Sequence, residues 1–200
     1  MPNVVSYNAN HVIKGPGRLW LNTALPASPG RITLDANGNP DGTESPNAIF
    51  LGMTREGCTF TETYTEQGQT CDELTAPYRT DIDAEAGTLE GEFLEVLNFQ
   101  RLAKLAPNGV YSAVTGVGAY SQITFGGVLT VVNVPVVLIA PQTADPTKFV
   151  VVQLYAAHNT AGIKLGLTKK KDAGIPFKLE AMIVPGRAAG DQLATIWKQD

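Results

Sequence analysis

Apolar and polar residues alternate with a period of two along much of the chain, which is the pattern of half-buried β-strands. The alternation is clearest between residues 59 and 66, where every second position is a threonine. Successive side chains of a strand point to opposite faces, so the threonines share one face and the intervening residues share the other. The first face holds Thr59, Thr61, Thr63 and Thr65, and the second holds Phe60, Glu62, Tyr64 and Glu66.

A second acidic strand follows the first after a loop over residues 67–77. Its polar positions change phase along the strand. Asp81, Asp83 and Glu85 fall in one phase, whereas Glu90 and Glu92 fall in the other. One extra residue near Gly87, forming a β-bulge, would bring all of these carboxylates onto a single face.

One helix is expected, over residues 93–106. An apolar stripe with spacings of three and four supports it, and Pro107-Asn108-Gly109 ends it. The stripe consists of Val96, Phe99, Leu102, Ala103 and Ala106.

The second half of the chain again predicts strands, over residues 121–125, 128–140, 148–155 and 175–183. Gly126-Gly127 between the first two is typical of a two-residue hairpin. The strands over 128–139 and 148–155 are apolar on both faces, so each needs a cover on both sides. That cover could be a helix, a second sheet or another subunit.

Two hundred residues suit a single domain with a sizeable core. The remaining segments are expected to be irregular. Residues 1–14 are interpreted as an N-terminal arm, 23–47 as a long loop rich in Pro, Gly, Asn and Asp, and 191–200 as a C-terminal arm or short helix.

Charge is distributed unevenly along the chain, whose net charge is −4. Residues 1–100 hold 5 basic and 14 acidic side chains, whereas residues 101–200 hold 10 and 5. Residues 56–95 alone carry eleven acidic side chains against one base, Arg79. Such a bipolar chain can stack on its own copies through complementary charge.

Motifs for chemistry are sparse. Cys58 and Cys71 are interpreted as reduced and incidental, and His11 and His158 lie far from other ligand types, so no metal site is expected. The chain has no Gly-x-Ser-x-Gly elbow and no phosphate-binding glycine loop. We therefore expect no catalytic residues, no cofactor and no enzyme activity.

A glycosidase-like carboxylate pair, such as Glu62 with Glu90, is a weaker alternative, because sugar clefts need exposed aromatic rings and this region has only Tyr64 and Tyr78. Lys169, Lys170 and Lys171 form one basic cluster, interpreted as a solvated loop tip or a partner contact. An acidic surface repels the nucleic-acid backbone.

Three stretches of sequence, taken in order, resemble a known family. Gly-Pro-Gly-Arg-Leu-Trp-Leu at residues 15–21 precedes a Pro-rich loop, and Ile-Phe-Leu-Gly-Met-Thr-Arg-Glu-Gly follows at 49–57. After the Thr- and Glu-rich hairpin comes Glu-Gly-Glu-Phe-Leu-Glu-Val-Leu-Asn-Phe at 90–99. Together these resemble the major tail protein, or tail tube protein, of long-tailed bacteriophages, especially those with non-contractile tails. The likeness covers residues 14–110 well and the rest loosely.

The resemblance implies a mainly β fold, a β-sandwich or barrel with one flanking α-helix, a long β-hairpin loop and extended terminal arms. Such proteins form hexameric rings that stack into a tube with an acidic lumen, through which genome DNA passes without specific binding. The implied lumen residues are Glu62, Glu66, Asp81, Asp83, Glu85, Glu90 and Glu92. The implied inter-ring stacking loop contains Gln69, Thr70, Cys71, Asp72, Glu73, Leu74 and Thr75.

The implied partners are other copies of the chain and further tail proteins, such as tape measure, terminator and distal tail components. The implied location is the virion tail, assembled in the host bacterial cytoplasm, and no secretory signal or membrane span is expected. One alternative is that the Thr59–Thr65 row faces the lumen, which would direct Glu62 and Glu66 toward a neighbour. The remaining alternatives are another tail or baseplate ring component, a β-sandwich adhesion or binding module, and a carbohydrate-active enzyme.

Overall fold

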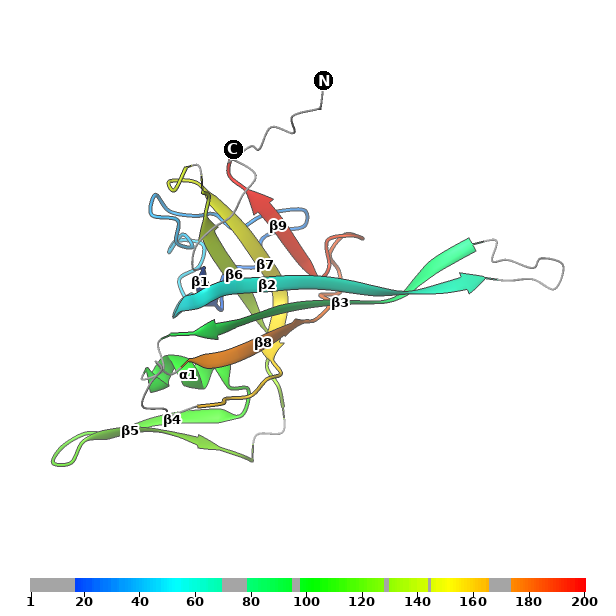
Figure 1. Cartoon of the computed structure of the whole chain (residues 1–200). Coiled ribbons are helices and arrows are strands. Elements are labelled where there is room, and N and C mark those ends of the chain that lie inside the picture. Colours follow the sequence, from blue (N-terminus) through cyan, green and yellow to red (C-terminus); the bar gives the residue numbers. More distant parts are fainter. Residues whose placement is uncertain (1–16, 70–78, 95–97, 128–129, 144, 166–173) are drawn as a thin grey trace, which may run out of the picture.

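The structure, a computed structural model, describes residues 17–69, 79–94, 98–127, 130–143, 145–165 and 174–200 (Figure 1). Within these ranges the chain is mainly β with one helix, as the alternation predicted. The elements are β1 (Arg18–Leu21), β2 (Ile49–Gln69), β3 (Arg79–Phe93), α1 (Phe99–Leu105), β4 (Gly109–Val114), β5 (Tyr120–Phe125), β6 (Val134–Pro141), β7 (Phe149–Asn159), β8 (Ile175–Ala181) and β9 (Ala194–Lys198).

Six strands close into an antiparallel barrel. They pair in the order β6-β1-β2-β3-β8-β7, and β6 also pairs with β7, which completes the ring. β9 adds to β7 beside this ring. Closure removes most of the unpaired edges that an open sheet would expose.

The barrel interior is the main core. Leu19, Leu89, Leu154 and Ile175 are fully buried there, and α1 contributes two more buried leucines, Leu102 and Leu105. Burying one such side chain contributes roughly 1.5–3 kcal/mol, so this interior supplies most of the driving force for folding.

A second core covers the outer faces of β6 and β7. Val137 and Ile139 of β6 and Val151 of β7 point out of the barrel and are fully buried against Ile32 of the long loop. Trp20, Leu34 and Trp197 pack around this group. The second apolar face of these strands is therefore covered by the chain's own loop over residues 23–47 and by β9, and not by another subunit.

The helix begins later than predicted. Phe93 is the last residue of β3, where it is buried and stacked on Phe177 with 4.3 Å between ring centroids. Asn98 caps α1, because its side-chain oxygen accepts a hydrogen bond from the Arg101 amide at 3.2 Å. The prediction that residues 93 and 94 are helical was wrong, because packing in the barrel holds Phe93 in the sheet.

The prediction of a hairpin at Gly126-Gly127 is also wrong. β5 pairs with β4, from Gly109 opposite Phe125 to Val114 opposite Tyr120, and the turn between them contains Gly116 and Gly118 at positive φ. β6 pairs instead with β1 and β7. Gly126 and Gly127 do adopt positive φ, but the strands on either side of them, β5 and β6, do not pair with each other.

The predicted C-terminal arm is largely a strand, since residues 194–198 form β9 and pair with residues 150–154 of β7. The long loop was predicted correctly: residues 23–47 contain no strand or helix beyond an isolated bridge between Leu34 and Pro40. The N-terminal arm over residues 1–14 lies outside the described residues.

Candidate assembly surface

The β2–β3 hairpin extends well beyond the barrel (Figure 1). β8 pairs with β3 only from Gly87 onward, and Gly87 lies opposite Glu62 of β2. Residues 63–69 and 79–86 therefore project past the last barrel contact, and we call them the projecting hairpin. At about 3.3 Å per residue, its β2 side spans roughly 23 Å.

The register of this hairpin has no bulge at Gly87. Pairing runs without a shift from Cys58 opposite Gly91 to Thr65 opposite Ala84, and the shift comes next, leaving Asp83 as the extra residue. Gly87 has a packing role instead, because a Cβ there would lie 3.0 Å from Cδ2 of Leu193. The predicted bulge position was therefore wrong.

This register divides the acidic residues between two faces. Directly opposed residues of an antiparallel pair share a face, so Glu62 and Glu85 lie on the face that continues the barrel interior. Glu66 joins them by alternation. Glu90 lies opposite Thr59, and Asp81 opposite Gln67, so both share the threonine face, together with Glu92. The prediction that all of these carboxylates share one face was therefore wrong. The prediction that the threonine row and Glu62 and Glu66 lie on opposite faces is confirmed.

The two faces differ in charge compensation. On the threonine face, Lys178 Nζ lies 2.6 Å from Glu90 Oε1, Arg55 lies 3.9 Å from Glu92, and Arg79 lies 2.6 Å from Asp81. Hydrogen bonding and charge from Glu90 raise the pKa of Lys178. Of the seven predicted lumen carboxylates, four have no ion pair within the described part of the chain: Glu62, Glu66, Asp83 and Glu85.

Strand edges are open along the same hairpin. Across the described ranges, β2 pairs with β1 only as far as Met53, and β3 has no partner on its β8 side over residues 79–86. Tyr64 and Ile82 on these strands are 54% and 57% exposed. Unpaired edges with exposed apolar side chains favour pairing with another chain.

A cleft of about 370 Å³ lies where the hairpin leaves the barrel. Phe60, Glu62 and Glu85 form its hairpin wall, and Leu193 and Ile196 lie on the β9 side. The cleft thus places two of the uncompensated carboxylates beside apolar side chains.

The remaining predicted contact residues divide by position. Gln69 is the last residue of β2 and pairs with Arg79, so residues 70–78 join the far ends of the hairpin. Thr70, Cys71, Asp72, Glu73, Leu74 and Thr75 lie outside the described residues, as do Lys169, Lys170 and Lys171.

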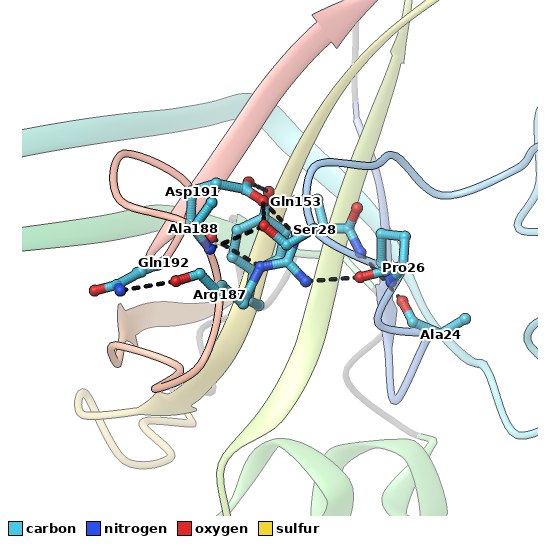
Figure 2. A network of polar contacts seen from close by, with 9 residues as sticks. Ala24, Pro26, Ser28, Gln153, Arg187, Ala188, Asp191 and Gln192 are labelled. Carbon is cyan, nitrogen blue, oxygen red and sulfur yellow. Dashed lines mark hydrogen bonds and ion pairs between the residues drawn. The ribbon is translucent and has the colours of Figure 1, made fainter.

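A buried polar network that the sequence did not predict fastens two loops to β7 (Figure 2). Arg187 donates to Asp191 Oδ2 at 2.8 Å and to the Pro26 carbonyl at 2.6 Å, and its guanidinium lies over the Tyr155 ring. Ser28 donates to Asp191 Oδ2 at 2.6 Å, and the Tyr155 hydroxyl donates to Asp191 Oδ1. The spacing of Arg187 and Asp191 is the only local signal for it.

This network shifts the pKa values of two of its residues, Asp191 and Tyr155. Hydrogen bonds from Ser28 and Tyr155, with the charge of Arg187, lower the pKa of Asp191. Burial, followed by the hydrogen bond to Asp191, raises the pKa of Tyr155. Every one of these groups has a partner, so the network fixes the loop containing Pro26 and Ser28 to β7.

Other reactive groups are dispersed. Cys58 is a free thiol, and burial raises its pKa to about 11. His158 Nδ1 lies 2.9 Å from Asn133 Oδ1. In the described part of the structure, no three His, Cys, Asp or Glu side chains are grouped to hold a metal ion. Nor does any helix there have the length and apolarity to cross a membrane.

Comparison with known proteins adds no relative. No family model matches the chain, and no curated protein matches it significantly.

Proposed function

We propose that this chain is a structural protein that assembles with its own copies through the projecting hairpin. The observation that carries the proposal is the hairpin itself, with two open edges and uncompensated carboxylates on a segment that extends past the last strand pairing of the barrel. An extended, unpaired edge is costly for a monomer, because it favours non-specific association. It is useful in a subunit whose edges are paired by a neighbour.

The form of assembly that fits best is a ring that stacks into a tube, as the likeness to phage tail tube proteins implies. The hairpin and the surface that receives it are different parts of the molecule, so the contact is heterologous. Heterologous contacts build rings when the rotation closes and filaments when it does not. In this proposal the assembly is non-enzymatic, is part of a virion tail, and conducts genome DNA past acidic walls that do not hold it.

The division of the acids refines this proposal. Either the threonine face with Glu90 and Glu92 or the opposite face with Glu62, Glu66 and Glu85 would line the channel. The second set has no ion pair among the described residues of its own chain, which makes it the better candidate for contact with a neighbouring copy. The threonine face is then the candidate lumen surface, and it would be less acidic than the resemblance implies, because Asp81, Glu90 and Glu92 are each paired with a cation.

A binding module is the second candidate. Three apolar side chains on one face of the β4–β5 hairpin are more than two-fifths exposed: Val110, Val114 and Tyr120. An exposed apolar patch of this kind also suits docking to another protein.

Negative-stain electron microscopy and sedimentation velocity over a concentration series would separate the two. We expect rings or hollow filaments with an axial channel. Monomers that persist at high concentration after seeding would overturn the assembly proposal and leave the binding module.

Deleting residues 69–75 tests the stacking role of the hairpin end. We expect a folded subunit with a native circular dichroism spectrum that no longer forms long tubes, because the deletion removes polar residues beyond the barrel. Full-length tubes from this variant would show that stacking uses another surface.

A further inference from the structure

A basic cleft lies at the opposite end of β9 from the projecting hairpin. Arg31 from the long loop, Lys148 from the start of β7 and Lys198 from β9 line a cleft of about 650 Å³ around Trp197. The Arg31 guanidinium lies 5.3 Å from the centre of the Trp197 ring. Ile32, also in the lining, is buried in the outer core, which fixes the floor of the cleft.

This cleft already holds one carboxylate of the chain. Asp200 lines it, with Oδ1 2.8 Å from Lys198 Nζ. Lys198 lowers the pKa of Asp200 most, and Lys148 and Arg31 lower it further, so all three cations stabilise the same carboxylate. The only other acidic partner of these cations in the described structure is Asp145, which lies 3.9 Å from Lys148.

The side chains that line the cleft therefore carry more positive than negative charge, which favours an acidic ligand. The hairpin has the opposite imbalance, because Glu66, Asp83 and Glu85 have no cation partner in the described chain. Figure 1 shows the hairpin directed away from the end of β9 that carries the cleft. A hairpin thus cannot reach the cleft of its own copy.

We propose that the basic cleft of Arg31, Lys148 and Lys198 is a carboxylate-binding site that receives the projecting hairpin of a second copy. Charge complementarity selects this occupant, since Glu66, Asp83 and Glu85 are uncompensated carboxylates on a described segment that extends well beyond the barrel. The contact is head to tail. It rests on the proposed self-assembly and names the two surfaces that meet.

Paired charge-reversal variants test the contact directly. The cleft variant R31E/K148E/K198E keeps an acidic hairpin, and the hairpin variant E66K/D83K/E85K keeps a basic cleft. Neither can bind its own copies, but the first variant's acidic hairpin would meet the native basic cleft of the second, and the second variant's lysine hairpin would meet the glutamates in the cleft of the first.

The mixture is therefore expected to associate through both compatible contacts, the native hairpin-to-cleft pair and the charge-reversed pair. In sedimentation velocity at 50 mM salt, we expect each variant alone to remain monomeric and the 1:1 mixture to form oligomers in which the two variants alternate. This association should weaken at least tenfold at 0.5 M salt, where screening shortens the range of charge to about 4 Å. A chain carrying both sets of reversals should self-assemble again.

Matched controls reverse exposed charges elsewhere. K104E/K164E and E44K should behave as the wild-type protein, and the neutral variant R31Q/K148Q/K198Q should weaken self-association less than R31E/K148E/K198E does. Circular dichroism confirms that each variant is folded before it is compared.

Two outcomes would overturn the inference. One is wild-type self-assembly by the R31E/K148E/K198E variant, and the other is a mixture that stays monomeric while the wild-type protein assembles. If the wild-type protein does not assemble either, microscopy refutes the proposed function. In that case, association of the two variants in the mixture would still establish the contact between cleft and hairpin. A mixture that also stays monomeric would refute both the contact and the proposed function.

Discussion

The network around Asp191 is the most sharply testable structural feature, because it joins segments far apart in the sequence. Tyr155 and Asp191 can be changed separately and together, as Tyr155→Phe, Asp191→Asn and the double variant. Tyr155 is 1% exposed, so its hydroxyl has no access to water that would replace the lost partner.

The expected magnitudes follow from what each change leaves behind. Tyr155→Phe leaves Asp191 with Ser28 and Arg187, so we expect a loss near the lower end of the range for hydrogen bonds to charged groups, about 1.5 kcal/mol. Asp191→Asn leaves Arg187, whose side chain is only 6% exposed, without its carboxylate but with the Pro26 carbonyl. A buried cation that keeps part of its shell should cost about 2–3 kcal/mol.

Urea unfolding, followed by tryptophan fluorescence at a concentration below assembly, gives the free energy of unfolding of all four proteins. We expect the double variant to lose about 1–1.5 kcal/mol less than the sum of the single losses, because one hydrogen bond is counted in both. Losses that add to within about 0.3 kcal/mol would show that the two side chains do not interact, and would refute the network.

The same network predicts a dependence on pH. The pKa of Asp191 is lower in the folded state than in the unfolded chain. Its contribution to stability is therefore fully present above the unfolded value near about 3.9 and is lost as pH falls through the folded value. Asp191→Asn should remove that part of the acid dependence. The raised pKa of Tyr155 acts at the other end, where stability is lost as pH rises above about 10.

Two further predictions concern the outer core and the thiol. Ile32→Ala should lower the free energy of unfolding, measured by urea denaturation, by about 2–3 kcal/mol, because Ile32 is 1% exposed and packs against Val137 and Ile139. The control Leu25→Ala, at a side chain that is 43% exposed, should change it by less than about 0.5 kcal/mol. Equal effects would mean that the long loop does not cover the barrel. Cys58, in a Cys71→Ser background, should react with iodoacetamide at pH 8 on the order of a hundredfold more slowly than a free thiol, because its pKa is about 11. A rate near that of a free thiol would contradict its burial.

Most strands could be predicted from the sequence, because their alternation is a local property. The threonine row of β2 and the one-sided pattern of β8 read directly as faces. The long loop was equally clear from its Pro, Gly, Asn and Asp content. Each of these depends only on neighbours within a few residues.

Features set by distant contacts were missed. The bulge lies at Asp83 and not at Gly87, because Gly87 must pack against Leu193, more than a hundred residues away. Trp197 was predicted to lie on an arm, but it packs against the outer core as part of β9. The partner of β5 also depended on pairing that the local glycine signal does not encode.

The candidate site was predicted in composition but not in geometry. The seven acidic residues were identified from the sequence, yet the sequence could not separate those with a cation partner from those without one. Glu90 is compensated by Lys178, 88 positions later, and this pair forms only because β3 and β8 are neighbours. The basic cleft is assembled from three separate segments and has no sequence signal of its own.

The two cores change the physical basis expected for assembly. Strands apolar on both faces required a helix, a second sheet or another subunit to cover the second face, and Ile32, Leu34 and Trp197 cover it within one chain. The surfaces left for a neighbour are open strand edges and uncompensated charges. Edge pairing is directional, and charge pairing is sensitive to salt. Assembly governed by these terms should therefore be ordered and reversible with ionic strength, unlike association driven by an exposed apolar face, which salt strengthens.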